Sequence, residues 1–251
     1  MRHAAKTPVM RDGKAGRRMG MDDLAVEAHV KLCSDEGHEV HLLATPEDLE
    51  DLAVGHALCE GWWTGLGPVP TAKASQVDSG HRVDLTGGPW SAPGEPRTIL
   101  PSCGGCGLEL DPPTPGTRVR HGEGCTSDEL RAHLAHLRNL QPLYLQTGGT
   151  HAAALVLEGE LLVREDIGRH SAVDKAIGAW LRSVESNDVH AMLISGRCGW
   201  DVMAKIVRSG VRQLAAVGAV SAQAAALARH AGVRVMGFAS GDDPQFIGPW
   251  N

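Results

Sequence analysis

The second half of the chain alternates short apolar strands with amphipathic helices, and this alternation limits the folds open to it. Strands are expected at 153–157, 161–164, 191–194, 213–217 and 233–238, and helices at 171–183, 200–209 and 221–230. A turn at Glu158-Gly159-Glu160 joins the first two strands as a hairpin. The later strands each follow a helix, which predicts a largely parallel sheet with helices on its faces. The sequence therefore predicts an α/β fold.

Polar clusters follow the strands of this predicted sheet. They are Glu165–His170, Ser195–Arg197 and Ala239–Asp243. In such sheets, ligands bind where the strands end. The convergence of the three clusters predicts a pocket there.

The residue types in these clusters favour a phosphorylated, nucleotide-like ligand. A helix that starts at Gly168-Arg169-His170-Ser171 offers free backbone N–H groups to an anion. Arg169 and Arg197 can add phosphate contacts. Asp166, Asp242 and Asp243 can accept from a base edge such as that of guanine. The alternative is a structural one, in which Asp166, Arg169, Asp174 and Lys175 form an ion-pair cluster around the helix start.

A pair of cysteines, Cys103 and Cys106, lies within the glycine-rich stretch Ser102–Gly107. Glycines favour a flexible loop over a helix, and such a loop can present a thiolate to a partner. Three alternatives remain at this stage, and the simplest is that both cysteines are ordinary loop thiols. The spacing to His121 and Cys125 also suits a structural zinc site. A thioredoxin-type redox pair lacks the expected βα context.

The first half reads as a smaller, strand-rich unit. Strands are expected at 25–31, 39–43, 73–77 and 81–85, and a helix with Thr45 as N-cap closes at Gly61. A second helix opens at Thr126, presents Leu130, Leu134 and Leu137 on one face, and ends before Pro142. We expect a disordered basic tail at 1–20, an N-terminal subdomain at 21–125 with the cysteine loop at 98–116, and an α/β domain at 126–251.

The composition argues against a nucleic-acid-binding, membrane-spanning or secreted protein. The 251 residues carry a formal net charge of −6, which argues against nucleic acid as a partner. No apolar run approaches a membrane span, and no apolar segment follows the basic N-terminus as a secretory signal requires. Six cysteines in such a chain are expected to stay reduced in the cytoplasm. Of these, Cys33, Cys59 and Cys198 are interpreted as packed thiols.

Four segments resemble one family, in the family's order. The segment Arg164–Lys175 is the most specific, and Ser195-Gly196-Arg197 with Lys205 downstream is a second match. The loop Ser102–Gly107 and the stretch Thr45–Gly55, followed by Glu60-Gly61, are the others. Together they are similar to the FdhD family, the formate dehydrogenase accessory sulfurtransferases.

The resemblance implies a homodimer whose C-terminal domain has a cytidine-deaminase-like three-layer α/β/α fold. It implies that a cysteine desulfurase loads sulfur as a persulfide on Cys103, with Cys106 as its companion. The sulfur then passes to the bis-molybdopterin guanine dinucleotide form of the molybdenum cofactor, which activates formate dehydrogenase. GDP is expected to mimic this cofactor, and no metal of the protein's own is expected. The implied cofactor-binding residues are Asp166, Arg169, His170, Arg197, Phe238, Ala239, Ser240, Gly241, Asp242 and Asp243.

The chain departs from the family pattern at three places. Ser240 stands where the family has arginine in Gly-Phe-x-Arg, so one cationic contact is missing. Gly218–Ser221 replaces a Ser-Ala-Pro-Thr segment, and Ser171 stands where asparagine is commoner. A zinc-dependent nucleoside deaminase, which shares the implied fold, needs His-x-Glu and Pro-Cys-x-x-Cys, and the chain lacks this pattern.

Overall fold

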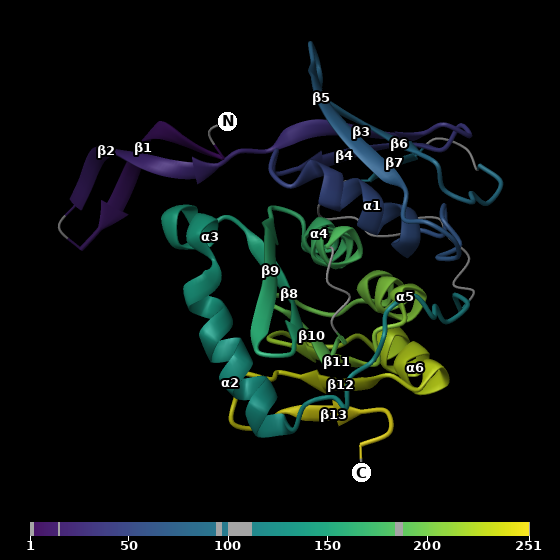
Figure 1. Ribbon diagram of the computed structural model, residues 1–251. Helices are drawn as coiled ribbons and strands as arrows, with labels where there is room; N and C mark the ends of the chain where they lie inside the picture. Colours follow the sequence, from purple (N-terminus) through teal and green to yellow (C-terminus); the bar gives the residue numbers. More distant parts are fainter. Residues whose placement is uncertain (1–2, 15, 94–96, 100–111, 184–187, 251) are drawn as a thin grey trace.

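The computed structural model describes residues 3–14, 16–93, 97–99, 112–183 and 188–250. Their strands form three sheets, of two, five and six strands. The five-stranded and six-stranded sheets lie on opposite sides of a helical layer, and the two-stranded sheet projects from the body (Figure 1).

The five-stranded sheet has the order β5-β6-β3-β4-β7. Its strands are β3 (Ala28–Ser34), β4 (Glu39–Ala44), β5 (Thr71–Val77), β6 (Gly80–Thr86) and β7 (Arg97–Ile99). Buried residues alternate with less buried ones along β4 and β6, so this sheet packs on its inner side only. Helix α1 (Leu49–Cys59) covers that inner side. The four strands expected before the cysteine loop are confirmed, each displaced by at most a few residues.

The start of α1 corrects one prediction. The helix begins at Leu49, after Asp48 in the left-handed region with φ of 50°. Thr45 is fully buried and does not cap this helix. Its Oγ1 instead accepts a hydrogen bond from the Ile167 amide at 3.1 Å. The hydroxyl therefore ties this segment to the other half of the chain.

The six-stranded sheet has the order β13-β12-β11-β10-β8-β9. Its members are β8 (His151–Leu157), β9 (Glu160–Asp166), β10 (Ala191–Ile194), β11 (Gln213–Ala216), β12 (Arg234–Gly237) and β13 (Gln245–Ile247). Only β10, β11 and β12 run parallel, while β8, β9 and β13 are antiparallel to their neighbours. The three strands that follow helices, β10, β11 and β12, are parallel as predicted, while the antiparallel edge strand β13 was not predicted. The β8–β9 hairpin itself is confirmed.

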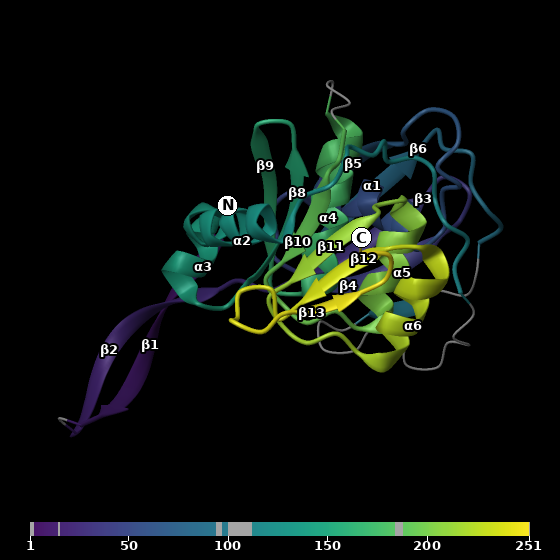
Figure 2. The same cartoon turned by 90° about the horizontal axis from the view of Figure 1, so that it is seen from below.

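Helices cover both faces of this sheet. Helices α4 (Arg169–Arg182), α5 (Trp200–Ser209) and α6 (Ala222–Ala231) share a core with one face, and α2 (Ser127–Leu137) packs on the other through Leu130, Leu134 and Leu137. Figure 2 shows α2 and α6 on opposite sides of the strands. The three-layer α/β/α arrangement is therefore confirmed. The predicted start of α2 is also confirmed, since Thr126 and Glu129 form a capping box.

A 3₁₀ turn (Arg138–Leu140) and the short helix α3 (Pro142–Thr147) follow α2. The helical segment ends before Pro142, as predicted. Pro142 itself starts α3, because proline fits the first turn, where an N–H has no intrahelical partner. Both α1 and α4 contribute to one hydrophobic cluster shared by the two larger sheets. The predicted division near residue 125 falls between β7 and α2 and stays a prediction. No helix in the described ranges is long and apolar enough to cross a membrane.

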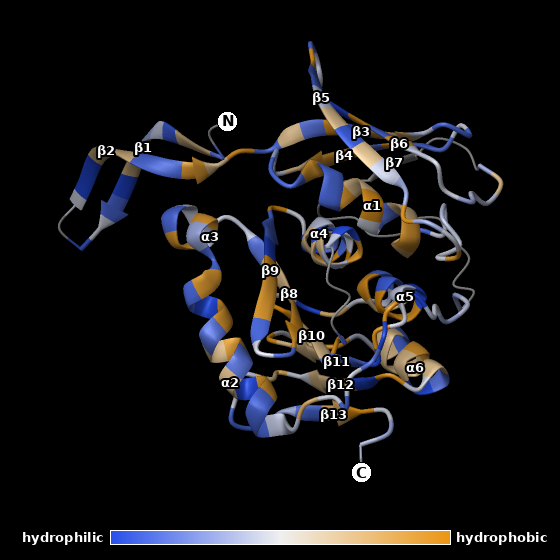
Figure 3. Cartoon of the chain, viewed as in Figure 1, coloured by the Kyte–Doolittle hydropathy of each residue, from blue (hydrophilic) through white to orange (hydrophobic). Residues whose placement is uncertain are grey.

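The N-terminal residues form a hairpin arm rather than a disordered tail. Strands β1 (Ala4–Gly13) and β2 (Gly16–Ala25) pair antiparallel along their whole length. The arm leaves the body beside α3 (Figures 1 and 2). Its hydropathy is mixed (Figure 3), and Met10, Met19 and Met21 are more than 60% exposed. Because such a ribbon buries little core, its composition resembles that of a disordered segment.

Candidate functional site

A cavity of about 1090 Å³ lies at the carboxyl ends of the three parallel strands. Ser195 follows β10, Val217 follows β11 and Ser240 follows β12, and all three line the cavity. The opposite wall comes from α2, α3 and the turn between them, and includes Arg131, Leu134, Arg138, Tyr144 and Leu145. The structure thus brings the second and third predicted polar clusters to one cavity.

The segment after β12 is fixed by its backbone. The amides of Phe238 and Ala239 donate to the carbonyls of Gly218 and Ala216, at 3.1 and 3.0 Å. Phe238 has φ of 48° and a half-exposed ring, while the Ala239 methyl is fully buried. Ser240 reaches the cavity, and Gly241, Asp242 and Asp243 are exposed beyond it. The side chains open to a ligand here are therefore those of Phe238, Ser240 and the two aspartates.

The predicted residues at the start of α4 contact an acid from the next helix. Asp201, the second residue of α5, accepts through Oδ2 from Nε2 of His170, and Nη2 of Arg169 lies 3.5 Å from the same oxygen. Burial alone raises the pKa of Asp201, but the bond from His170, its charge and that of Arg169 lower it to about 2. Arg197, on the loop after β10, is exposed. The carboxylate is thus ionised and fixes both side chains.

His151 connects this cluster to the cavity. It lines the cavity wall at the start of β8. Burial lowers its pKa, and the nearby charges of Arg169, His170 and Arg197 lower it further. Cations therefore converge on this end of the sheet, which suits an anionic ligand.

Asp166 does not face a ligand. Its side chain is 0% exposed, and its carboxylate lies 2.7 Å from Nζ of Lys175. It also accepts from the amides of Thr45 and Gly168, at 3.0 and 2.8 Å. Burial raises its pKa, while Lys175 and the amide donors act in the opposite direction. Its predicted role as a base-reading acceptor is therefore corrected: the structural alternative holds for Asp166 and Lys175.

The cysteines of the predicted loop, Cys103 and Cys106, lie outside the described residues. Of the alternative zinc set, His121 and Cys125 are described. Burial raises the pKa of the Cys125 thiol to about 11. The ranges covered by the structure contain no group of three or more histidine, cysteine or acidic side chains arranged to hold a metal.

The three cysteines interpreted as packed thiols, Cys33, Cys59 and Cys198, are buried and free. Burial raises the pKa of each, to about 12 for Cys198. They are packed thiols, as predicted.

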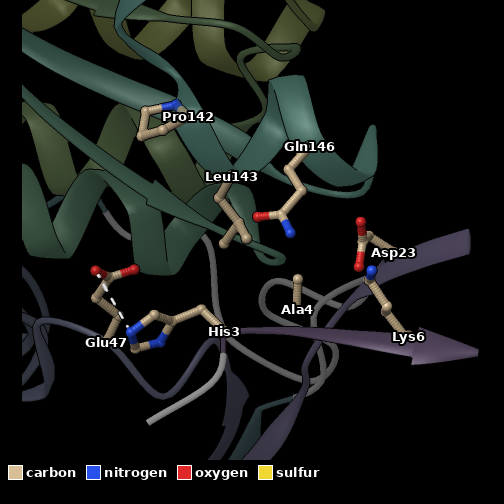
Figure 4. A pocket seen from close by; sticks show the side chains of 8 residues that line it. All are labelled: His3, Ala4, Lys6, Asp23, Glu47, Pro142, Leu143 and Gln146. Atoms are coloured by element: carbon tan, nitrogen blue, oxygen red, sulfur yellow. Dashed lines mark ion pairs between the residues drawn. The ribbon is translucent and has the colours of Figure 1, made fainter.

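A second cavity, of about 550 Å³, lies between the arm and α3 (Figure 4). Its wall includes Lys6, Asp23 and Gln146, and His3 lies 3.7 Å from Glu47 across it. None of the predicted site residues lines this cavity. The cavity at the strand ends is therefore the candidate site.

Sequence reasoning missed the far wall of the cavity, as well as His151 and Asp201. Asp201 carried a signal, because it stands in the first turn of a predicted helix just after the Ser195–Arg197 cluster. Nothing in the pattern of α2 and α3 indicates a cavity wall, since their outward residues resemble an ordinary solvated face.

Comparison with known proteins agrees with this picture. The sequence profile of the FdhD/NarQ family matches residues 25–246. The chain is 33% identical over 244 residues to "Sulfur carrier protein FdhD" of Variovorax paradoxus, covering 91% of this chain and 86% of the relative. It is 35% identical over 229 residues to the protein of the same name from Cupriavidus necator, covering 86% and 78%.

A solved structure shares the fold. It is a candidate formate dehydrogenase accessory protein from Desulfotalea psychrophila, with a TM-score of 0.72 and 18% identity, covering 99% of this chain and 98% of that one. The profile match and the two relatives span nearly the whole chain, and on that ground the chain belongs to the FdhD/NarQ family.

Proposed function

We propose that this protein is a sulfur carrier and formate dehydrogenase accessory protein that works as a sulfurtransferase in the cytoplasm. A cysteine desulfurase loads sulfur on Cys103, and the protein passes it to the bis-molybdopterin guanine dinucleotide cofactor. The names of the curated relatives support the carrier role. The proposal that the protein binds the cofactor rests on the cavity at the strand ends and on the cationic side chains of Arg169 and Arg197 near it.

The cavity suits one nucleotide end of such a cofactor. Its volume of about 1090 Å³ is slightly above the usual range of small-molecule sites, which run to about 1,000 Å³. Apolar Tyr144 and Leu145 on one wall can contact a base, while Arg131 and Arg138 add positive charge. Asp242 and Asp243, exposed at the exit of β12, can accept from the N1–H and amino group of guanine. When bound, the cofactor supplies the metal centre that receives the sulfur.

Loading is a thiol–persulfide exchange. The Cys103 thiolate attacks the terminal sulfur of the desulfurase persulfide, a new S–S bond forms, and the desulfurase cysteine leaves as a thiolate. Cys106 can take up the same sulfur by a second exchange. No oxidant or reductant is consumed in either exchange.

The carrier role is tested by intact mass after incubation with a cysteine desulfurase and cysteine. We expect a mass increase of about one sulfur atom in the wild type and its loss in Cys103→Ala. Cys33→Ala, which removes a buried thiol, is the matched control and should load normally. An adduct that persists in Cys103→Ala/Cys106→Ala contradicts the loop as carrier. Metal analysis adds a check, since stoichiometric zinc lost in Cys125→Ser would favour the zinc alternative.

The ligand is tested by calorimetry with GDP and ADP. We expect GDP to bind with a dissociation constant in the millimolar range or tighter, and to bind better than ADP. Arg169→Ala should weaken binding by the value of about one charge-assisted hydrogen bond, about 1.5–3 kcal/mol. Equal affinity for the two nucleotides argues against a guanine-reading site.

We also propose that the protein is a homodimer whose arm contacts the second copy. An isolated two-stranded ribbon is marginally stable, and Pro8, Met10, Met19 and Met21 share one face of it. Six basic and three acidic residues lie in the first 25, whereas the whole chain carries −6, so the arm complements an acidic body. We expect a dimer by light scattering and a monomer for Met10→Thr/Met19→Thr/Met21→Thr. A wild-type monomer at micromolar concentration rejects the proposal.

A further inference from the structure

Packing alone does little to fix helix α3, which forms part of the wall of the cavity at the strand ends. Tyr144 and Leu145 line this cavity, and they are 46% and 66% exposed. Pro142, Leu143 and Gln146 line the smaller cavity on the side of the arm (Figure 4). The helix therefore lies between two cavities, and of its six residues, all of them described, Leu143 alone is buried.

One carboxylate on strand β9 fixes the start of this helix. Oε2 of Glu165 accepts from the amide of Leu143 at 2.9 Å, and Oε1 accepts from the amide of Tyr144 at 2.7 Å. Both amides lie in the first turn, where they have no intrahelical acceptor and where a negative charge is favourable. Among the described residues, no other side chain beyond the helix and its cap bonds to the helix backbone.

The same carboxylate connects α3 to another part of the cavity wall. Thr150 lines the cavity just before β8, and its hydroxyl donates to Oε1 of Glu165 at 2.9 Å. Oε1 thus joins two residues that line the cavity, Tyr144 and Thr150. Glu165, although it is described, is not among the lining residues. A change at this carboxylate therefore moves the wall and removes no direct contact with a ligand.

The part of the wall that Glu165 fixes is apolar and suits a nucleobase. It presents the ring of Tyr144 beside the side chain of Leu145. Every base has a flat face that can stack on an aromatic ring. The lining cations Arg131 and Arg138 come from α2 and the turn after it, to which Glu165 makes no hydrogen bond. The base and the phosphates of a nucleotide can therefore be recognised by separate parts of the wall.

We propose that Glu165 is the positioning residue of a base-binding wall, in which the Tyr144 ring stacks on the nucleobase of the bound nucleotide. The inference rests on the proposed cofactor site and adds a residue to it. Glu165 touches no ligand and acts through the backbone of α3. Its loss weakens ligands that carry a base and leaves phosphate recognition unchanged.

The test measures binding of GDP and of inorganic pyrophosphate, which has no base, by calorimetry. Glu165→Gln keeps the size of the side chain but offers one acceptor oxygen in place of two, so an amide of α3 loses its partner. We expect this variant to weaken GDP about tenfold, within the range of one base–aromatic stack, and to leave pyrophosphate within about twofold. Glu160→Gln, which changes an exposed acid on the same strand, is the matched control and should bind both ligands as the wild type does.

A double-mutant cycle separates this role from a general defect. If Glu165 acts through the ring, Glu165→Gln should weaken GDP by less than about twofold in a protein that already carries Tyr144→Ala. Equal loss of GDP and pyrophosphate in Glu165→Gln, or losses that multiply in the double variant, overturn the inference, because a defect elsewhere in the fold gives either result. Unchanged GDP affinity in Glu165→Gln overturns the inference alone and leaves the cofactor site in place.

Tyr144 is the only tyrosine of the chain, so labelling with fluorotyrosine gives one fluorine NMR signal. Should Glu165→Gln fail to fold, or pyrophosphate bind too weakly to measure, this signal decides in the wild type. GDP must shift it more than pyrophosphate does, and a signal that GDP does not move rejects the base-binding wall. A wild type that binds no GDP overturns the inference together with the proposed cofactor site, while persulfide loading on Cys103 still tests the carrier function separately.

Discussion

Gly55 of α1 and Gly178 of α4 face each other where the two helices cross, and neither position has room for a side chain. A Cβ at Gly55 would lie 1.8 Å from the carbonyl oxygen of Asp174, and one at Gly178 would lie 1.8 Å from that of Asp51. The helix backbones are therefore in direct contact. Helix α1 packs on the five-stranded sheet, and α4 belongs to the helical layer that covers the six-stranded sheet. The contact between the two helices therefore joins the two sheets.

Replacing Gly178 with alanine should destabilise the whole fold. The new methyl group meets backbone atoms that cannot rotate away, so the helices must separate. Overpacking usually costs about 1–3 kcal/mol, and we expect the upper end or more. The better helix propensity of alanine offsets about 1 kcal/mol of this. Urea unfolding measures the change. Gly20→Ala in the arm, where no atom lies within 4 Å, is the control and should be neutral. A Gly178→Ala variant as stable as the wild type contradicts the close crossing.

A buried group of charges lies beside this crossing. Nζ of Lys205 donates to Asp174 at 2.9 Å and to Glu60, and Nδ1 of His56 lies 3.2 Å from the same Asp174 oxygen. Burial alone lowers the pKa of Lys205, but Asp174 and Glu60 raise it overall, so the lysine stays charged. None of these residues lines the candidate cavity, so we interpret this group of charges as structural.

Removing the lysine should cost far more than one surface ion pair. Lys205→Met leaves Asp174 and Glu60 buried without their cation, and breaking a buried pair costs about 3–5 kcal/mol. Lys73→Met, on an exposed strand position, is the matched control. Thermal and urea unfolding report both. A loss below about 1 kcal/mol for Lys205→Met means that water or rearrangement satisfies the two acids.

The sequence predicted the periodic elements well and the long-range contacts poorly. The bounds of β10 and α5 are the predicted ones, because their apolar periodicity is clear and their neighbours are turn residues. The family resemblance is confirmed by the matched profile. Asp166 was placed in the pocket because it follows a strand, yet burial and Lys175 decide its role, and no local pattern reveals that pairing. The arm was missed for a different reason: its strands pair with each other and bury little core, so its composition resembles that of a disordered segment.

Asp201 should make stability depend on pH in a defined range. Its pKa is about 2 in the folded protein against 3.8 for an ordinary aspartate. A lowered carboxyl pKa stabilises the fold fully above about pH 4, and this contribution is lost as pH falls toward 2. We expect Asp201→Asn to lower the free energy of unfolding by on the order of 1–2 kcal/mol at pH 6, with the difference vanishing near pH 2. Urea titrations at several pH values measure it. A difference independent of pH would assign the effect to packing instead.

Phe238 combines backbone strain with a position beside the cavity. Its φ of 48° lies in the left-handed region, where a residue with a side chain is destabilised by about 1–2 kcal/mol. Its ring is 42% exposed, so burial of the ring offsets little of this destabilisation. We expect Phe238→Gly to unfold at the same or a higher urea concentration than the wild type and to bind GDP more weakly, because the ring is lost as a surface for the base. Phe246→Ala, another exposed aromatic residue on the neighbouring strand β13, should leave GDP binding unchanged. A variant that is at least as stable as the wild type but binds GDP more weakly is expected only if the Phe238 ring contacts the ligand. A variant that loses stability while retaining full affinity would show that the ring supports the fold instead.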